Sequence, residues 1–397
     1  MASTNTTPAP NIELMYFDAG GGHRSAMNAL TASLATTHPH WNVKATNVQE
    51  LLKPVDPVHA VTGHTSEDVY NRAITHGITW GSKAFLHTLQ MGIRLNGKRI
   101  SEQLQQHWDR QLPDMVVSMI PNFNRYMHRG LREVSAHTPY VTIMTDIADL
   151  QRDFWQVRHR GRDMHIICGS ERAYRQAHLR GFYRPENIHK VSGMILKPAF
   201  YEAAGNNPPI TLESLGLDPA KPTAIIMFGG NGSRVSVDIM DDLDAAGVDI
   251  QYIVLCGKDK DLQKSLHNRP RCAAIGFTNR VQDYMRISSV FIGKPGPGSL
   301  SEALHMGLPA IVENNGRTMV QERYNVTWVE EREAGFAVRK FGEIAGAMGY
   351  ITRPDVLAHY RDKAAAFNNR AVFEIPAVLE RILINGQATG PASPRVG

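Results

Sequence analysis

The sequence predicts an α/β protein made of two Rossmann-like, doubly wound domains that face each other across a cleft. Short apolar runs alternate with helical patterns along almost all of the 397 residues, as expected of strand–helix–strand units. That length exceeds one ordinary hydrophobic core and favours two domains. A glycine-rich loop between an apolar run and a helix occurs in both halves, so the same arrangement of strand, loop and helix is expected in each.

The strands are expected at a series of apolar runs. In the first half these are IELMYF (12–17), WNVKATNV (41–48), MVVSMI (115–120), YVTIMTDI (140–147), MHIICGS (164–170) and HKVSGMI (189–195). In the second half they are TAIIMFGG (223–230), DIQYIVLCG (249–257), CAAIGF (272–277), VFIGKPG (290–296) and LPAIVEN (308–314). Many runs are apolar throughout, which is typical of parallel strands that are covered on both faces.

The segment 203–222 is rich in Gly, Asn and Pro and interrupts this alternation, so we expect the link between the domains there. The predicted parts are an N-terminal domain at 1–205, a C-terminal domain at 206–370, a terminal helix at 371–387 and a disordered tail at 388–397. Pro376 should mark a break in that helix or its start, because proline has no N–H for the helical hydrogen bond.

The net charge of +5 comes entirely from the first half of the chain. Residues 1–205 hold 22 Lys and Arg against 17 Asp and Glu, whereas 206–397 hold 21 of each. This excess favours an anionic partner, either nucleic acid or an acidic membrane surface, although it is also compatible with solubility alone. Within this half, 66–110 interleaves large apolar and basic residues, which predicts either a membrane-surface segment or a helix pair packed on the sheet.

Several classes of protein are disfavoured. The three cysteines are odd in number and far apart, so neither a disulfide scaffold nor a zinc site is predicted. The N-terminus lacks the basic and apolar regions of a secretory signal, and no run of 18 apolar residues predicts a transmembrane helix. A reducing compartment is therefore expected.

Three glycine-rich loops are the main functional signal: DAGGGHRS (18–25), FGGNGSR (228–234) and GKPGPGSLSEA (293–303). A strand, a glycine loop and a helix together present free backbone N–H groups and the positive end of the helix to an anion. None of the loops matches GxGxxG or GxxxxGK[ST], which disfavours a dinucleotide oxidoreductase and a P-loop kinase. The loops predict a phosphate-bearing ligand in the cleft.

The motifs GGGHRSAMNAL, VTIMTDI, FGGNGS, GFTNRVQDYM, KPGPGSLSEALHMGLPAI and QERYN occur in the order found in one glycosyltransferase family. From about 12 to 345 the chain resembles the monogalactosyldiacylglycerol synthases and the processive diacylglycerol glucosyltransferases, of family 28 type. The resemblance implies the GT-B architecture, with the terminal helix crossing back to the N-terminal domain. It also implies inverting transfer of a hexose from a UDP-sugar to a membrane lipid hydroxyl, usually without a metal.

The resemblance makes His23 the catalytic base; the residues alone leave open a histidine that is only held at a helix start. Asp18, at the end of the preceding strand, could orient His23 or replace it. Asp146 ends another strand, where such folds bind ligands, and could act on the acceptor or the sugar. Gly21 and Gly22 would supply backbone groups beside the acceptor.

The resemblance assigns the donor site to the second half. Glu302 would bind the ribose of UDP, although Ser299 and Glu302 also fit a capping box at a helix start. Gln321 and Glu322 of QERYN would clamp the donor sugar, and Tyr324 there departs from the family's usual small residue. The remaining predicted nucleotide contacts are Gly229, Gly230, Asn231, Ser233, Phe277, Gly296, Gly298 and Ser299, with Arg280 and Arg317 as further diphosphate partners.

No metal or other cofactor is predicted besides the UDP-sugar as co-substrate. Asp259 and Asp261 form an Asp-x-Asp pair, but Lys258 and Lys260 interleave with it and it is interpreted as a turn opening a helix. The expected protein is a cytoplasmic enzyme, peripheral on the inner face of the cell membrane, that glycosylates a lipid such as diacylglycerol.

Two alternatives stay open at this stage. One is a UDP-sugar epimerase or a glycosyltransferase with a soluble acceptor on the same fold. The other is a non-catalytic protein that binds nucleic acid or anionic lipid, which would leave the glycine loops, Glu302 and Gln321 without a role. Galactose or glucose as donor, the acceptor lipid, the number of sugars added and the oligomeric state are not determined by the sequence.

Overall fold

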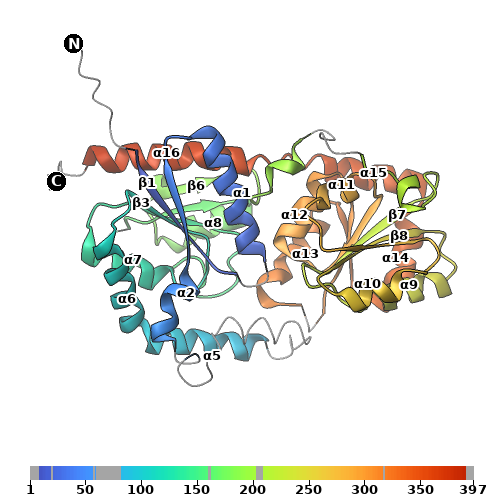
Figure 1. The fold of residues 1–397 in the computed structure, drawn as a ribbon, viewed down its shortest axis with the longest axis horizontal. Helices are drawn as coiled ribbons and strands as arrows, with labels where there is room; N and C mark the ends of the chain where they lie inside the picture. Colours follow the sequence, from blue (N-terminus) through green and yellow to red (C-terminus); the bar gives the residue numbers. More distant parts are fainter. Residues whose placement is uncertain are drawn as a thin grey trace, which may run out of the picture. The chain divides into compact units, whose positions relative to one another are not determined.

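A computed structural model describes residues 9–18, 21–56, 59, 82–159, 162–202, 209–315 and 318–389. The chain divides into two compact units. Unit 1 holds the described residues up to Arg72, from Lys83 to Lys197 and from Arg370 onward, and unit 2 consists of Ala73–Ser82, of which Ser82 is described, and Pro198–Asn369. In each unit the ribbon shows a twisted sheet with helices along both faces (Figure 1).

Unit 1 is built on a six-stranded parallel sheet in the order β2-β1-β3-β4-β5-β6. The strands are β1 (Asn11–Tyr16), β2 (Asn42–Asn47), β3 (Met115–Ser118), β4 (Tyr140–Ile143), β5 (His165–Cys168) and β6 (Ile188–Lys190). The strand order reverses between β1 and β3. Ligands of open α/β sheets bind at such a reversal, outside the carboxyl ends of the strands.

The described helices of unit 1 cover both faces of its sheet. They are α1 (Gly22–Thr37), α2 (Val48–Leu52), α5 (Ser82–Leu95), α6 (Gly97–Arg110), α7 (Asn124–Val134), α8 (Glu171–Arg180) and α16 (Ala371–Thr389), with 3-10 turns η1 (Lys53–Val55) and η2 (Pro185–Asn187). Leu14 and Val117 face a core shared with α1 and α16. Met15 and Val116 face the other core, which includes α6 and α7. The alternation of side chains along each strand therefore supplies both cores.

The terminal helix α16 packs on α1 within unit 1, and its apolar residues Ile375 and Leu379 are fully buried there. Pro376 lies inside this helix rather than at a break or at its start, so that expectation was wrong. Proline at this position cannot donate to the carbonyl of Val372, four residues earlier. Ser33 Oγ of α1 donates to that carbonyl at 2.7 Å, which satisfies the acceptor and allows the helix to continue.

Unit 2 also contains a six-stranded parallel sheet, in the order β12-β11-β10-β7-β8-β9. Its strands are β7 (Thr223–Met227), β8 (Gln251–Gly257), β9 (Cys272–Gly276), β10 (Val290–Gly293), β11 (Ala310–Glu313) and β12 (Gly335–Val338). The order reverses between β7 and β10, and two of the predicted glycine loops follow these two strands.

The helices of unit 2 are α9 (Val235–Ala245), α10 (Lys260–Leu266), α11 (Val281–Arg286), α12 (Pro297–His305), α13 (Arg323–Glu330), α14 (Ile344–Ile351) and α15 (Pro354–Ala365). Its 3-10 turns are η3 (Pro198–Phe200), η4 (Glu213–Leu215), η5 (Val320–Glu322) and η6 (Phe341–Glu343). Ile226 of β7, Met240 of α9 and Ile344 of α14 belong to one buried core of this unit.

Each predicted apolar run overlaps a strand, although β6 shares only residues 189 and 190 with its run, and the structure adds β12, which the sequence analysis missed. The described part of 66–110 forms α5 and α6. Part of that segment, from 66 to 81, lies outside the described residues, as do 203–208 of the predicted link and 390–397 of the predicted tail. Among the described helices, none combines the length and the apolar composition that crossing a bilayer requires.

Candidate active site

His23 lies in the first turn of α1, at the edge of the unit 1 sheet where the strand order reverses. Its ring contacts the segments that follow the neighbouring strands. Nδ1 lies 3.1 Å from Oγ1 of Thr145, just after β4, and the backbone of Met119, just after β3, accepts a hydrogen bond from the ring. The fold thus places the predicted base at the ligand-binding edge of a doubly wound sheet.

The ring of His23 is partly exposed, but its desolvation is strong enough to dominate its protonation. Burial lowers the pKa of His23 to about 4, and the hydrogen bond to Met119 opposes this only in part. His23 is therefore neutral near pH 7, and a neutral imidazole is the form that can accept a proton.

Asp18 does not contribute the contact expected of it. Its carboxylate forms an ion pair with Arg24, with Oδ2 2.6 Å from Nη1, while the side-chain contact to His23 Nδ1 comes from Thr145. A catalytic role for Asp18 stays a prediction. Gly21 is the N-cap of α1 at φ 79°, a left-handed conformation that favours glycine, and an added Cβ at Gly21 or Gly22 would meet no atom within 4 Å.

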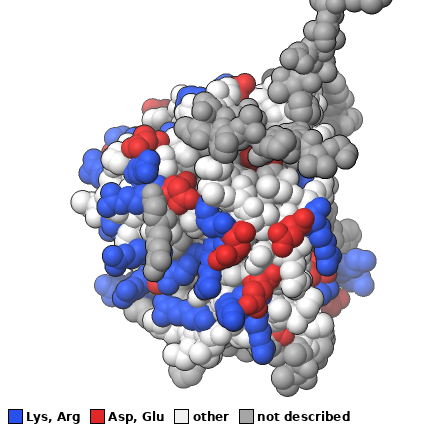
Figure 2. All heavy atoms as spheres, turned by 90° about the vertical axis from the view of Figure 1, so that its left-hand side faces the viewer, with Lys and Arg blue, Asp and Glu red and all other residues white. Residues whose placement is uncertain are grey.

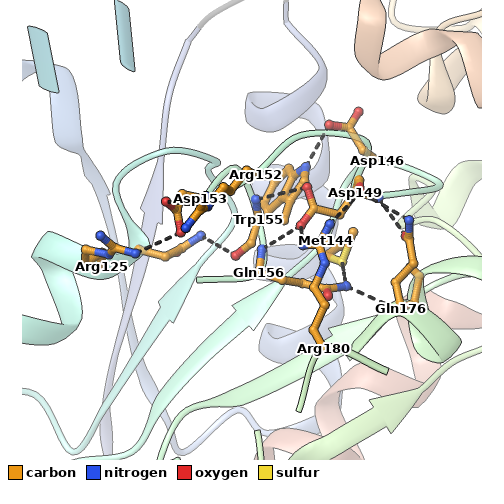
Figure 3. A network of polar contacts seen from close by, with 12 residues as sticks. Arg125, Met144, Asp146, Asp149, Arg152, Asp153, Trp155, Gln156, Gln176 and Arg180 are labelled. Atoms are coloured by element: carbon orange, nitrogen blue, oxygen red, sulfur yellow. Dashed lines mark hydrogen bonds and ion pairs between the residues drawn. The ribbon is translucent and has the colours of Figure 1, made fainter. Parts of the chain in front are cut away.

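Asp146 is buried directly after β4, and its Oδ2 accepts a 2.7 Å hydrogen bond from Nε1 of Trp155. The fully buried indole of Trp155 in turn lies 6.1 Å, centroid to centroid, from the ring of His23. Figure 3 shows Asp146 beside the edge of Trp155. In this structure Asp146 therefore fixes an aromatic neighbour of the candidate base, while its predicted contact with acceptor or sugar stays a prediction.

A buried aspartate that the sequence analysis missed organises the segment after β4. Asp149 Oδ2 forms an ion pair with Arg180 of α8 and accepts from the backbone N–H of Gln156 at 2.9 Å. Gln176 bonds to both the N–H and the carbonyl of Asp149 (Figure 3). Burial raises the pKa of Asp149, and Arg180 opposes that shift. This network holds the segment that carries Trp155.

In unit 2, the loop FGGNGSR after β7 packs closely against the loop after β8. A Cβ added at Gly232, where φ is 73°, would lie 2.2 Å from the carbonyl oxygen of Cys256. By contrast, a Cβ added at Gly229 or Gly230 would meet no atom within 4 Å, and Asn231 is exposed. Ser233 Oγ accepts from the N–H of Val235 at the start of α9. The predicted contact residues of this loop thus lie on its open side.

The second loop, after β10, opens α12 at the same reversal of strand order. Gly296 is the N-cap, Pro297 is the first helical residue, and Gly298 and Ser299 follow within the first turn. The expected capping box was wrong, because the helix begins before Ser299 at a proline suited to the first position. Glu302 lies one turn into the helix, so N-capping does not explain it. No described side chain caps this helix start.

The QERYN segment braces the second loop. Nδ2 of Asn325, which the sequence analysis did not single out, donates to the carbonyl of Pro295 at 2.7 Å. Glu322 is buried, and its Oε1 lies 3.7 Å from the Cβ position of Gly296. Burial raises the pKa of Glu322, with Lys294 opposing the shift. Gln321 is only partly buried, and its amide contacts the sulfur of Met319.

The other predicted nucleotide contacts are Phe277, Arg280 and Arg317. Phe277, just after β9, keeps 59 % of its surface exposed. Arg280 forms an ion pair with Asp283 at 2.7 Å, and Arg317 lies outside the described residues. Asp259 is the N-cap of α10 and accepts from the N–H of Leu262, as expected of a turn that opens a helix.

One group of potential metal ligands occurs among the described residues: His128, His159 and Asp163 in unit 1. Asp163 already accepts a 2.7 Å hydrogen bond from Nε of Arg132, which also lies 3.2 Å from Nε2 of His128. A guanidinium in that position balances the carboxylate and opposes a cation.

Comparison with known proteins connects this geometry to a family. Residues 225–340 match the model of the Glycosyltransferase family 28 C-terminal domain. Monogalactosyldiacylglycerol synthase 1 of Arabidopsis thaliana is 25 % identical over 350 residues, which cover 82 % of this chain and 61 % of that protein. The processive diacylglycerol beta-glucosyltransferase of Bacillus subtilis is 25 % identical over 275 residues, 68 % of each chain.

Solved structures show the same architecture at low identity. The calicheamicin glycosyltransferase CalG4 has a TM-score of 0.60 and 12 % identity, with 97 % of this chain and 100 % of that chain covered. MurG of Acinetobacter baumannii has a TM-score of 0.58 and 9 % identity, with 94 % and 99 % covered. The architecture is therefore GT-B, with two Rossmann-like domains, as the sequence analysis predicted.

Proposed function

We propose that the chain is an inverting hexosyltransferase, because residues 225–340 match the model of the Glycosyltransferase family 28 C-terminal domain. It transfers galactose or glucose from a UDP-sugar to the hydroxyl of a membrane lipid, with diacylglycerol as the expected acceptor. The relatives from Arabidopsis and Bacillus carry diacylglycerol in their names, which supports this substrate class.

One observation carries the proposal: the two glycine loops of unit 2 follow β7 and β10, the adjacent strands at which the strand order reverses. Backbone N–H groups at the start of α12, together with the open side of the β7 loop, suit a diphosphate. Such preorganised donors stabilise the charge that develops on a departing UDP. Glu302, one turn into α12, is proposed to accept hydrogen bonds from the ribose hydroxyls.

His23 is proposed to deprotonate the acceptor. In inverting transfer the hydroxyl attacks the anomeric carbon while a base takes its proton. A neutral imidazole has one N–H, which donates either to Oγ1 of Thr145, 3.1 Å from Nδ1, or to the backbone of Met119, and the other ring nitrogen is the one that can accept the proton. The low pKa of His23 keeps that nitrogen unprotonated near neutral pH.

The outward side of α5 is proposed to contact the membrane. Met91 and Leu95, one turn apart, are 63 % and 80 % exposed, and Arg94 on the same helix and Lys98 and Arg99 at the start of α6 are exposed as well. Apolar side chains flanked by basic ones suit an anionic bilayer surface. Figure 2 shows Lys and Arg gathered toward one side of the face of the molecule that it presents. We accordingly propose a peripheral enzyme on the cytoplasmic face of the cell membrane.

The test is product formation by the purified protein. Vesicles containing diacylglycerol are supplied with UDP-galactose or UDP-glucose, and UDP release is measured together with lipid products by mass spectrometry. A hexosyl-diacylglycerol of β configuration, made from an α-linked donor, is the expected result. UDP release with a soluble alcohol but not with vesicles would instead indicate a soluble-acceptor enzyme. Interconversion of the two UDP-sugars without transfer would indicate an epimerase.

A further inference from the structure

We propose that Lys294 binds the diphosphate of a UDP-sugar at the start of α12, and that the buried carboxyl of Glu322 takes up a proton when this diphosphate binds. Both residues belong to unit 2: Lys294 directly follows β10, and Glu322 ends η5. The inference rests on the proposed function in taking a UDP-sugar as the ligand. It adds a cation for the diphosphate and the protonation state in which the donor is bound.

Gly296 marks the point where these two side chains meet the start of α12. A Cβ added at Gly296 would lie 3.2 Å from Oγ of Ser299, 3.7 Å from Oε1 of Glu322 and 3.8 Å from Cε of Lys294. The φ of Gly296 is −68°, which any residue can adopt, so its lack of a side chain matters here for space and not for conformation. Three polar residues therefore converge on one point at the N-terminus of this helix.

Lys294 brings a positive charge to this point. Its side chain is partly buried, and among the described residues its ammonium group has neither an ion pair nor a hydrogen-bond acceptor. The first N–H groups of α12 have no partner within the helix, and no described side chain caps them. An ammonium group beside the N-terminus of a helix favours an anion.

Glu322 is a carboxyl group with 5 % of its surface exposed, and no group among the described residues donates a hydrogen bond to it. An ionised carboxylate in such surroundings is unfavourable unless hydrogen-bond donors or a counter-charge lie close to it. Burial accordingly raises the pKa of Glu322, and Lys294 is the one described charge that opposes this shift. The ionised form of Glu322 therefore depends on Lys294.

The other described charged side chains on the elements packed around Glu322 do not replace Lys294. They are Glu302 on α12, Glu313 on β11 and Arg323 on α13. Arg323 is exposed, and none of the three contributes to the pKa shift of Glu322.

The backbone between Lys294 and Gly296 is held in place without a ligand. Nδ2 of the fully buried Asn325 donates to the carbonyl of Pro295 at 2.7 Å, and the N–H of Gly296 donates to the carbonyl of Lys294 at 2.8 Å. Because this geometry is already fixed, binding of the diphosphate does not have to pay for ordering the loop.

The diphosphate competes with Glu322 for the charge of Lys294. The diphosphate of a UDP-sugar stays ionised throughout the neutral pH range, so one ammonium group cannot balance both it and a carboxylate. Its binding takes the counter-charge from Glu322 and adds a negative neighbour, and both changes raise the pKa of a carboxyl group. Glu322 then takes a proton from the solvent, and its O–H becomes a hydrogen-bond donor to the bound UDP-sugar.

The pH dependence of binding follows from this change in the pKa of Glu322. Because that pKa is higher in the complex than in the free protein, a UDP-sugar binds most tightly below the pKa of the free protein. The gain in affinity is lost as the pH rises through the pKa of the complex. UDP-sugars are the probes, since the terminal phosphate of UDP itself titrates at about pH 6.

The experiment measures binding and not transfer. UDP-glucose and UDP-galactose are titrated calorimetrically into the full chain from about pH 6 to 9, in pairs of buffers that differ in ionisation enthalpy. The difference between the buffers gives the number of protons taken up, which should reach up to about one per UDP-sugar. An infrared difference spectrum should show the band of a protonated carboxyl appearing with the ligand.

Glu322→Gln should abolish the proton uptake and the infrared band and make the dissociation constant independent of pH. Glu330→Gln is the matched control, because Glu330 is exposed at the end of α13 and its substitution removes the same charge. This control should keep the proton uptake of the wild-type protein. Thermal unfolding of each variant checks that it is folded.

Lys294→Gln should weaken binding of the UDP-sugars by about tenfold or more, and Lys294→Arg should restore most of the loss. Lys294→Gln should also reduce the proton uptake, because Glu322 would already hold its proton in the free protein. Lys264→Gln, at an exposed position of α10, removes the same charge and should weaken binding by about twofold or less.

Binding of the UDP-sugars without proton uptake at any pH in this range would overturn the inference and leave the proposed function intact. Proton uptake that persists in a folded Glu322→Gln protein would overturn it as well, because another group would then hold the proton. Equal losses of affinity in Lys294→Gln and Lys264→Gln would reject Lys294 as the cation for the diphosphate. Failure of the wild-type protein to bind any UDP-sugar would overturn the proposed function together with the inference.

Discussion

Nδ1 of His23 lies 3.1 Å from Oγ1 of Thr145, so the candidate base of this protein has a hydroxyl where many catalytic histidines have a carboxylate. A carboxylate would stabilise the imidazolium and raise the pKa of the ring. A hydroxyl can fix the orientation of the ring without that charge, which is consistent with the low pKa of His23.

His23→Gln should reduce kcat for lipid glycosylation by about a hundredfold or more, the usual contribution of a general base. The dissociation constant for UDP should stay unchanged, because the nucleotide contacts are proposed in unit 2. His137→Ala, which removes an exposed histidine of the same unit, is the control and should retain activity. Normal turnover in the His23 variant would reject the base role.

The acid limb of the pH profile should lie unusually low. Protonation inactivates the base, and burial lowers the pKa of His23 to about 4 from the usual value near 6.5. The kcat/KM should therefore remain constant as the pH falls from 7 to about 5 and decline only below that. Thr145→Val should leave the acid limb at the same low pH, because the substitution adds no charge that would raise the pKa of His23. An acid limb near pH 6.5 in the wild-type protein would contradict the proposed desolvation of the His23 ring.

Glu302→Gln should weaken UDP binding by about tenfold, since a carboxylate accepts hydrogen bonds from ribose hydroxyls more strongly than an amide does. Calorimetric titration with UDP and with uracil separates the ribose contact from the base contact. Uracil binding should be unaffected. An unchanged dissociation constant for UDP would mean that Glu302 does not bind the ribose. N-capping of α12 would not explain Glu302 either, because the helix begins at Pro297.

Gly232→Ala should destabilise unit 2, whereas Gly230→Ala should be nearly neutral. At Gly232 the new Cβ would lie 2.2 Å from the carbonyl oxygen of Cys256 at φ 73°, whereas at Gly230 it would meet no atom within 4 Å. The left-handed conformation alone costs about 1–2 kcal/mol for a residue with a Cβ. Urea unfolding measures the difference, and equal stability of the two variants would contradict the backbone contact.

Ser33→Ala should cost about 1–3 kcal/mol of unfolding free energy, because it leaves the buried carbonyl of Val372 without a donor. The cost should be smaller in a Pro376→Ala background, where an N–H at 376 can donate to that carbonyl. A double-mutant cycle of urea unfolding measures this coupling. Additive effects of the two substitutions would mean that the serine and the proline act separately.

The sequence predicted those elements that have a local signal in the chain, such as an apolar run or a glycine-rich loop. Apolar runs such as TAIIM located β7, and the loops after β7 and β10 followed from runs of glycine. The strand β12 was missed because GFAV is only four residues long and begins with glycine. The start of α12 was placed too late because Ser299 and Glu302 imitate a capping box, although Pro297 already occupies the first turn.

The partners of the candidate site residues could not be predicted, because they come from segments far apart in the chain. Thr145 is 122 residues from His23, and Asn325 reaches a carbonyl 30 residues away. Sequence order indicates that these segments lie at the same edge of a sheet, but which side chains meet there depends on the register between strands. Asp149 shows the same limit, since only its buried contact with Arg180 distinguishes it from a surface aspartate.

The return of α16 to unit 1 has a consequence for synthesis of the chain. The core beside α1 is completed by Ile375, Leu379 and Leu383, which the ribosome adds only after all of unit 2. Apart from residues 73–82, unit 2 runs from Pro198 to Asn369 and is translated before α16, so one apolar face of unit 1 stays uncovered until then. Premature termination before residue 371 would therefore expose the half of the molecule that was translated first.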